Sequence, residues 1–207
     1  MLFWFLILLF HFYKLQHLYL LFLLNNYKVK LLVLVFVIPH HLGFVFQEFN
    51  LLDTFTIEDN IYLPLVLSGM TYADMKERLI PIARELSITE LLKKYPYEVS
   101  GGQKQRAAVA RALITNPRLV LADEPTGALD SKATDELLSL FGKINQSGQT
   151  VLMVTHSVKA ASHAGRVLFI KDGEVFHQIY RGDCTNEQLY QKISDTLTML
   201  ATGGEKA

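Results

Sequence analysis

The sequence of 207 residues predicts an α/β fold in which the strands of a parallel sheet alternate with helices. Two short apolar runs, residues 119–122 (LVLA) and 150–154 (TVLMV), have the continuous hydrophobicity expected of strands buried on both faces. Residues 131–146 lie between them and form an amphipathic pattern with helical spacing. The apolar side of this predicted helix consists of Leu137, Leu140, Phe141 and Ile144.

Residues 41–113, which precede these runs, predict one strand, a loop and several helices. Residues 41–46 (HLGFVF) predict a strand, and residues 47–55 predict a loop. Thr56 and Asp59 mark a helix start, with Pro64 limiting its length. Residues 72–86 predict a helix with a break or kink at Pro81. The pattern Ser87-Ile88-Thr89-Glu90 predicts a capping box that begins another helix, ending before Pro96. Gly101 and Gly102 then open a helix that continues to about Leu113.

The final third predicts a short helix, a hairpin and a long helix. The short helix follows Ser157, and the hairpin strands, residues 167–170 and 174–180, flank the turn pair Asp172-Gly173. Thr185 and Gln188 cap the last helix. Its apolar stripe consists of Leu189, Ile193, Leu197 and Leu200.

Composition excludes several classes of protein. Lys plus Arg (20) balance Asp plus Glu (20), which argues against a nucleic-acid-binding surface over the whole chain. The single cysteine, Cys184, excludes an internal disulfide framework and a cysteine-rich metal site. It also favours a reducing compartment.

Residues 1–39 form an apolar head that differs from residues 40–207, whose composition is that of an ordinary soluble domain. The head is mostly Leu, Phe, Val and Tyr, and its only charges are Lys14, Lys28 and Lys30. Residues 1–24 are long enough to span a bilayer, although a lysine in mid-span is costly. Two other hypotheses stay open: a wrong or frameshifted start in an AT-rich gene, and a buried apolar segment.

Two adjacent carboxylates, Asp123 and Glu124, follow the apolar run of residues 119–122. Ligands of α/β proteins bind at the carboxyl ends of parallel strands. Neighbouring carboxylates repel unless a cation joins them, and Mg²⁺ binds carboxylate oxygens, waters and phosphates. The pair therefore favours a nucleotide site with Asp123 toward the metal and Glu124 toward a water; the alternative is a strand end with two solvated acids.

The sequence Ser100-Gly101-Gly102-Gln103 leads directly into a predicted helix. The backbone N–H groups at a helix start form an anion site, and glycines let a phosphate approach closely. The alternative is a plain helix cap. Two further residues also follow strands. His156 could bind a phosphate or be structural, and Gln47 could contact a metal or water or cap a turn.

Together these motifs resemble one family, the ATP-binding subunits of ABC transporters. The residues that carry the resemblance are Gln47, VSGGQ (99–103), LVLADEPTGALD (119–130) and His156, over about residues 41–180. The surrounding phrases are similar to the branch that serves lipoprotein release, macrolide export and bacitracin-type peptide resistance, with the last favoured. The resemblance implies an ABC-type nucleotide-binding domain with a partial parallel sheet and a helical subdomain over about residues 53–113.

The resemblance also implies a role for each matching residue. Ser100, Gly101, Gly102 and Gln103 would be the signature motif that reads the γ-phosphate of ATP on the opposite subunit, with Val99 in place of the usual leucine. Asp123 would be the Walker B aspartate that holds Mg²⁺, and Glu124 the general base. Gln47 would be the Q-loop glutamine near the metal, Asp130 would close the D-loop, and His156 would be the switch histidine.

One part of the family pattern is missing from this sequence. The phosphate loop, G-x-x-x-x-G-K-[ST], should precede Gln47, but the first glycine is Gly43 and the pattern does not occur later. We therefore expect an ATP-binding subunit of an exporter at the cytoplasmic face of a bacterial plasma membrane, defective alone. Its expected partners are transmembrane permease subunits and a second nucleotide-binding subunit, not a nucleic acid. The alternatives are a non-catalytic subunit that supplies its signature motif to a partner, and a membrane-anchored interaction protein.

Overall fold

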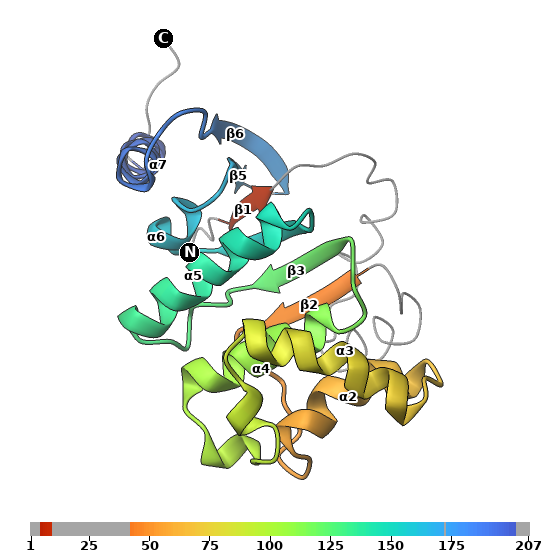
Figure 1. Ribbon diagram of the computed structural model, residues 1–207. Helices are drawn as coiled ribbons and strands as arrows, with labels where there is room; N and C mark the ends of the chain where they lie inside the picture. Colours follow the sequence, from red (N-terminus) through yellow and green to blue (C-terminus); the bar gives the residue numbers. More distant parts are fainter. Residues whose placement is uncertain (1–4, 10–41, 172, 202–207) are drawn as a thin grey trace.

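The computed structural model describes residues 5–9, 42–171 and 173–201, which form a sheet with helices on its sides (Figure 1). The described strands make one six-stranded sheet in the order β2-β3-β4-β1-β5-β6. The pairs β2–β3 and β3–β4 are parallel, whereas β1 is antiparallel to both β4 and β5, and β5 and β6 form an antiparallel hairpin. The strands are β1 (Phe5–Leu9), β2 (Leu42–Phe46), β3 (Leu119–Asp123), β4 (Thr150–Thr155), β5 (Arg166–Lys171) and β6 (Glu174–Tyr180).

The helices fall into three groups around this sheet (Figure 1). One group, within the residues expected to form the helical subdomain, contains α2 (Ile57–Leu67), α3 (Tyr72–Glu85) and α4 (Gly101–Leu113), with 3₁₀ turns at Thr89–Leu91 and Pro96–Glu98. The helix α5 (Ser131–Gln146) packs against β4, and α6 (Val158–Ala161) contacts α7 (Asn186–Ala201). The α/β fold predicted from the sequence is confirmed.

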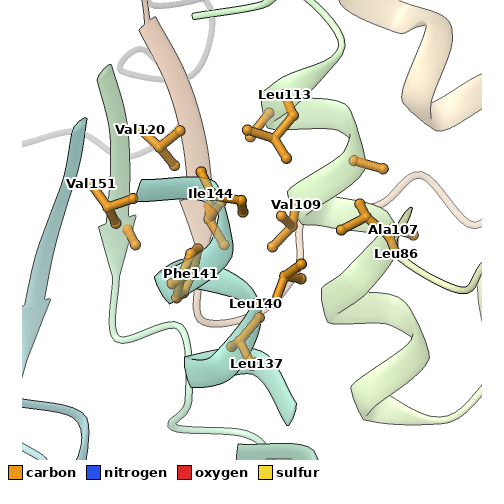
Figure 2. Packing of buried hydrophobic residues seen from close by; sticks show 14 of the residues in the cluster. Leu86, Ala107, Val109, Leu113, Val120, Leu137, Leu140, Phe141, Ile144 and Val151 are labelled. Carbon is orange, nitrogen blue, oxygen red and sulfur yellow. The ribbon is translucent and has the colours of Figure 1, made fainter. Parts of the chain in front are cut away.

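The core that positions the site lies between the parallel strands and the helices α4 and α5. Figure 2 shows side chains of both helices directed toward the strands. These side chains are almost fully buried, and removing their apolar surface from water is the main stabilising contribution. The labelled residues are Leu86, Ala107, Val109, Leu113, Val120, Leu137, Leu140, Phe141, Ile144 and Val151.

Ser87 ends a helix, and the prediction that it begins one is wrong. Its backbone is left-handed (φ 53°), and its N–H donates to the carbonyl oxygen of Arg84 at 3.1 Å. The N–H of Ile88 donates to the carbonyl of Ala83 at 2.9 Å, so both residues satisfy the last carbonyls of α3. Only a 3₁₀ turn at Thr89–Leu91 follows, without a side-chain cap.

Neither Pro64 nor Pro81 breaks its helix. The expected break at Pro81 does not occur, whereas α2 ends at Leu67, three residues after Pro64. Both lie inside continuous helices, α2 and α3. Pro64 and Pro81 fall in the second half of their helices, where each removes one backbone hydrogen bond while the remaining turns continue. The capping box of Thr56 and Asp59, in contrast, is confirmed at the start of α2.

Part of the apolar head belongs to the sheet. Residues Phe5–Leu9 form β1, which pairs along its backbone with β4 on one side and β5 on the other. Residues 10–39, which include most of the segment 1–24 considered as a membrane span, lie outside the described residues. Among the helices of the described part, none is both long and apolar enough to cross a bilayer.

Candidate functional site

Three parallel strands end level with one another and bring four of the expected site residues to one edge of the sheet. In the strand register Phe46 pairs with Asp123, and Asp123 pairs with Val154. Each strand is therefore followed, at the same edge of the sheet, by an expected site residue or its segment: Gln47, Glu124 and the segment that contains His156. This is the edge at which α/β proteins bind ligands.

Glu124 is fixed at this edge by contacts from the neighbouring strand. Its backbone is left-handed (φ 43°), and its N–H donates to the carbonyl of Val154 at 2.8 Å. Its carboxylate accepts hydrogen bonds from the backbone N–H of His156 at 2.5 Å and the Thr155 hydroxyl at 3.0 Å. The His156 Nε2 lies 3.7 Å from the same carboxylate. The two residues expected to be catalytic are therefore direct neighbours.

Gln47 and Asp123 are the expected metal ligands, and both side chains are exposed at this edge. A Cβ at Gly127 would lie 2.7 Å from the Gln47 Nε2, so the glycine in DEPTGALD leaves room for this glutamine. Their oxygens are of the type that Mg²⁺ prefers. No cluster of three His, Cys, Asp or Glu side chains suited to a metal occurs within the described residues. The two residues fit an Mg²⁺ ion that takes its other ligands from water and phosphate.

The signature residues lie in a second place, a pocket of about 310 Å³ at the N-termini of α4 and α5. Ser100 caps α4: its hydroxyl accepts from the Gln103 N–H at 3.3 Å, while the Gln103 side chain accepts from the Ser100 N–H at 2.8 Å. Asp130 caps α5 by accepting from the Ala133 N–H at 2.8 Å. The lining is Ser100, Gly101, Gly102, Gln103, Arg106, Ala128, Leu129, Asp130, Lys132, Ala133 and Glu136.

The pocket has the electrostatic character of an anion site. Two helix N-termini converge on it, and each presents backbone N–H groups and the positive end of its dipole. The helices approach closely because position 102 is glycine: a Cβ there would lie 2.9 Å from that of Ala133. The charged side chains of the lining balance, with Arg106 and Lys132 against Asp130 and Glu136, and Arg106 pairs with Glu136 at 3.0 Å. The attraction for an anion therefore comes from the backbone N–H groups.

Three polar residues that sequence reasoning missed bind the backbone at the end of β2 and in the loop that follows it. Gln105 donates to the carbonyl of Phe46, and Arg111 donates to the carbonyls of Phe49 and Asn50. Burial lowers the pKa of Arg111 to about 10, so the guanidinium stays charged at neutral pH. Asn60, fully buried, accepts from the Leu52 N–H at 2.7 Å and donates to three carbonyls of residues 52–56.

The only signal for these residues in the sequence is that each polar side chain interrupts the apolar face of a helix. The spacing to the loop, 59 to 62 residues for Gln105 and Arg111, follows no local rule.

Comparison with known proteins identifies the family. The family described as "ABC transporter" matches residues 37–127. The ABC transporter ATP-binding protein YxdL of Bacillus subtilis (strain 168) is 54% identical over 160 residues, which cover 77% of this chain and 62% of that protein. The bacitracin export ATP-binding protein BceA of Halalkalibacterium halodurans is 47% identical over 161 residues, covering 77% and 64%.

A solved structure agrees with this match. The dimeric ATP-binding cassette MJ0796, in a post-hydrolysis state bound to ADP and phosphate, is 34% identical with a TM-score of 0.61 and covers 76% of this chain and 68% of its own. The chain spans less than two thirds of the length of the curated relatives YxdL and BceA. The resemblance stated from the motifs, including the bacitracin-export branch, is confirmed, and the chain belongs to the ATP-binding proteins of ABC transporters.

Proposed function

We propose that this chain is an ATP-binding subunit of an ABC exporter, and that the pocket between α4 and α5 binds the terminal phosphate of ATP held by a second nucleotide-binding subunit. The observation that carries the proposal is the convergence of two capped helix N-termini, at Ser100 and Asp130, on one pocket. Such a pocket favours a multiply charged anion. The likeness to MJ0796, a dimeric cassette with bound ADP and phosphate, supports it.

The strand-end residues complete the proposal. Asp123 and Gln47 would hold Mg²⁺ beside the nucleotide phosphates. When bound, Mg-ATP supplies the phosphoryl group that is hydrolysed. Glu124 would accept the proton of the attacking water, and its carboxylate is held for this by the Thr155 hydroxyl and the His156 N–H. His156, 3.7 Å from Glu124, would contact the same phosphate.

The chain alone is expected to be a poor ATPase. Its 207 residues contain no G-x-x-x-x-G-K-[ST] loop, whose backbone N–H groups and lysine normally surround the β- and γ-phosphates. Phosphoryl transfer depends almost entirely on positioning and electrostatic stabilisation. Glu124 and His156 therefore lack a firmly held nucleotide, whereas the signature pocket does not depend on that loop.

The relatives suggest the biological setting. BceA is named for bacitracin export, and we extend that class, a peptide antibiotic, to this chain. The corresponding partners are transmembrane permease subunits together with the second nucleotide-binding subunit. The site of action would be the cytoplasmic face of a bacterial plasma membrane.

A complementation assay tests the proposal. The partner is a bacitracin-export cassette that keeps its phosphate loop but has its own signature serine replaced. The full chain is added to it in increasing amounts, and ATP hydrolysis is measured. We expect hydrolysis to rise to a plateau, because the pocket of this chain completes the partner's site.

Ser100→Arg is the critical variant, since the longer cationic side chain fills the pocket, and it should abolish the rise. Gln191→Met, on the exposed side of α7, is the matched control and should leave the rise intact. Failure of the unmodified chain to raise hydrolysis at any concentration contradicts the proposal.

A further inference from the structure

Gln105 occupies a position that packing alone does not explain. It lies in the second turn of α4, one turn beyond the signature residues, and its side chain is fully buried. Its Nε2 donates to two backbone carbonyls, that of Pro125 at 2.8 Å and that of Phe46 at 3.3 Å. These carbonyls belong to two different strand ends of the sheet.

The two bonded carbonyls flank the residues expected to act on nucleotide. Phe46 directly precedes Gln47, and Pro125 directly follows Glu124. An amide NH₂ has two hydrogens and can serve two acceptors at once, which neither a hydroxyl nor an apolar side chain can do. One side chain of the signature helix therefore joins the segments that carry Gln47 and Glu124.

The cost of burying an amide indicates that Gln105 is needed for its two hydrogen bonds. The Gln105 Oε1 has no hydrogen-bond partner among the described residues, and an unsatisfied buried acceptor is unfavourable. An apolar residue of the same shape would fill the space without that penalty. The amide is therefore explained by its donors, not by the volume that it occupies.

A second contact extends the same link along α4. Arg111 binds the carbonyls of Phe49 and Asn50 near the end of the helix. The end of β2 and the loop that follows it are thus attached to α4 at two places. Of the two, only Gln105 also reaches the segment after Glu124.

We propose that Gln105 is a positioning residue that fixes the signature helix relative to the carboxyl edge of the sheet, so that Ser100, Gln47 and Glu124 keep one mutual arrangement. The functional part rests on the proposed function, because it concerns how well the signature pocket serves a partner's ATP. The structural part concerns this chain alone. The two parts are tested separately.

Hydrogen exchange of the full chain tests the structural part. Gln105→Met keeps the length of the side chain and removes both donors. We expect the amides of Phe49 and Gly127, which bond to the Phe46 and Glu124 carbonyls, to exchange about three- to tenfold faster, the equivalent of one neutral hydrogen bond. The amides of β5 and the control Gln191→Met should be unchanged. Unchanged exchange at both Phe49 and Gly127 overturns the proposal.

The complementation assay tests the functional part, and it separates positioning from simple loss of folded protein. A positioning role predicts a lower plateau of hydrolysis at saturating Gln105→Met, with little change in the concentration that gives half of the plateau. Gln105→Glu, which keeps the shape but places a carboxylate against two carbonyl oxygens, should lower the plateau further. An unchanged plateau for both variants overturns the functional part.

The possible failures are distinguishable. If the unmodified chain does not raise hydrolysis, the proposed function fails, and hydrogen exchange still decides whether Gln105 joins the two strand ends. If the unmodified chain raises hydrolysis and both variants match it, Gln105 has no positioning role.

Discussion

Two consecutive residues in the loop after β2, Phe49 and Asn50, have left-handed backbones with φ of 61° and 48°. Residues other than glycine adopt this region at an energetic cost, so surrounding contacts must hold them there. The Arg111 guanidinium does so by donating to both carbonyl oxygens, at 2.8 Å for Phe49. Its position in the last turn of α4 also suits a cation.

Replacing Arg111 by Met is therefore expected to destabilise the chain. The two carbonyls would lose charged donors, which costs about 1–3 kcal/mol in the free energy of unfolding. Urea denaturation measures the difference. Arg84→Met, on the exposed side of α3, removes the same charge and should change stability by less than about 0.5 kcal/mol. Equal effects of both substitutions would contradict the assigned role of the Phe49 and Asn50 contacts.

His163 predicts a dependence of stability on pH. Burial, and then the positive charge of Arg181, lower its pKa below the usual value, while Asp135 opposes this and Lys159 adds to it. The unfolded chain takes up the proton near pH 6.5, before the folded chain does, so it binds more protons as the pH falls. Stability from this group is therefore complete above about pH 6.5 and decreases below it.

The corresponding variant is His163→Gln. We expect its urea midpoint to fall less between pH 7 and pH 5 than that of the unmodified chain, because the group that takes up the proton is gone. The replacement His177→Gln, at an exposed position of β6, provides the comparison. A pH dependence identical to that of the unmodified chain would refute the role of His163.

The site residues expected from motifs lie at the ends of helices and strands, whereas those found only in the structure bind backbone that is distant in the sequence. Ser100, Asp123, Glu124 and Asp130 stand at element ends, where the sequence shows a cap or a polar residue after an apolar run. Side chains that bind distant backbone, such as Gln105, depend on how α4 lies against β2, which no local pattern encodes.

The strand β2 packs closely against α4 because residue 43 is glycine. A Cβ at this position would lie 2.4 Å from the carbonyl oxygen of Ala112. That oxygen belongs to the backbone of a packed helix, so it cannot move aside independently. The close approach of β2 to the C-terminal end of α4 therefore depends on this glycine.

Gly43→Ala is expected to destabilise the chain by about 1–3 kcal/mol, the usual cost of overpacking. Gly142→Ala provides a matched control, because it lies inside α5 with no atom within 4 Å of the added Cβ. It should stabilise the chain by about 0.5–1 kcal/mol, since alanine favours a helix more than glycine does. Thermal or urea unfolding measures both, and a Gly43→Ala protein as stable as the parent would show that the packing is not tight.

The elements were predictable where periodicity and caps agreed. The helix α5 begins and ends at the residues expected, 131 and 146, because Asp130 caps it and an apolar stripe runs through it. The prediction of a helix start at Ser87 is wrong because the S-x-x-E pattern also occurs after a helix, where a serine with a left-handed backbone ends the preceding turn. The pairing of β1 within the sheet had no sequence signal, since the head is apolar without alternation.

At the scale of the whole molecule, the candidate residues form two groups of different completeness. The pocket between α4 and α5 holds every signature residue together with Asp130. The strand edge holds Gln47, Asp123, Glu124 and His156, but the sequence supplies no phosphate loop for them. This difference is the basis of our proposal that the chain completes a partner's ATP site and binds its own nucleotide weakly.

Titration of the isolated full chain with Mg-ATP tests this asymmetry directly. Under the proposed function, the signature pocket would contact only one end of a nucleotide, and Asp123 and Gln47 would contact only its metal ion. We expect a Kd of about 1 mM or weaker, which corresponds to about 4 kcal/mol or less of binding free energy. Isothermal calorimetry with an intact bacitracin-export cassette as the positive control makes the measurement. Because Glu124→Gln removes the proton acceptor but no phosphate ligand, it should leave this weak binding unchanged. Micromolar affinity in the isolated chain would mean that other residues hold the phosphates, and the assignment of a partner-dependent site would then be wrong.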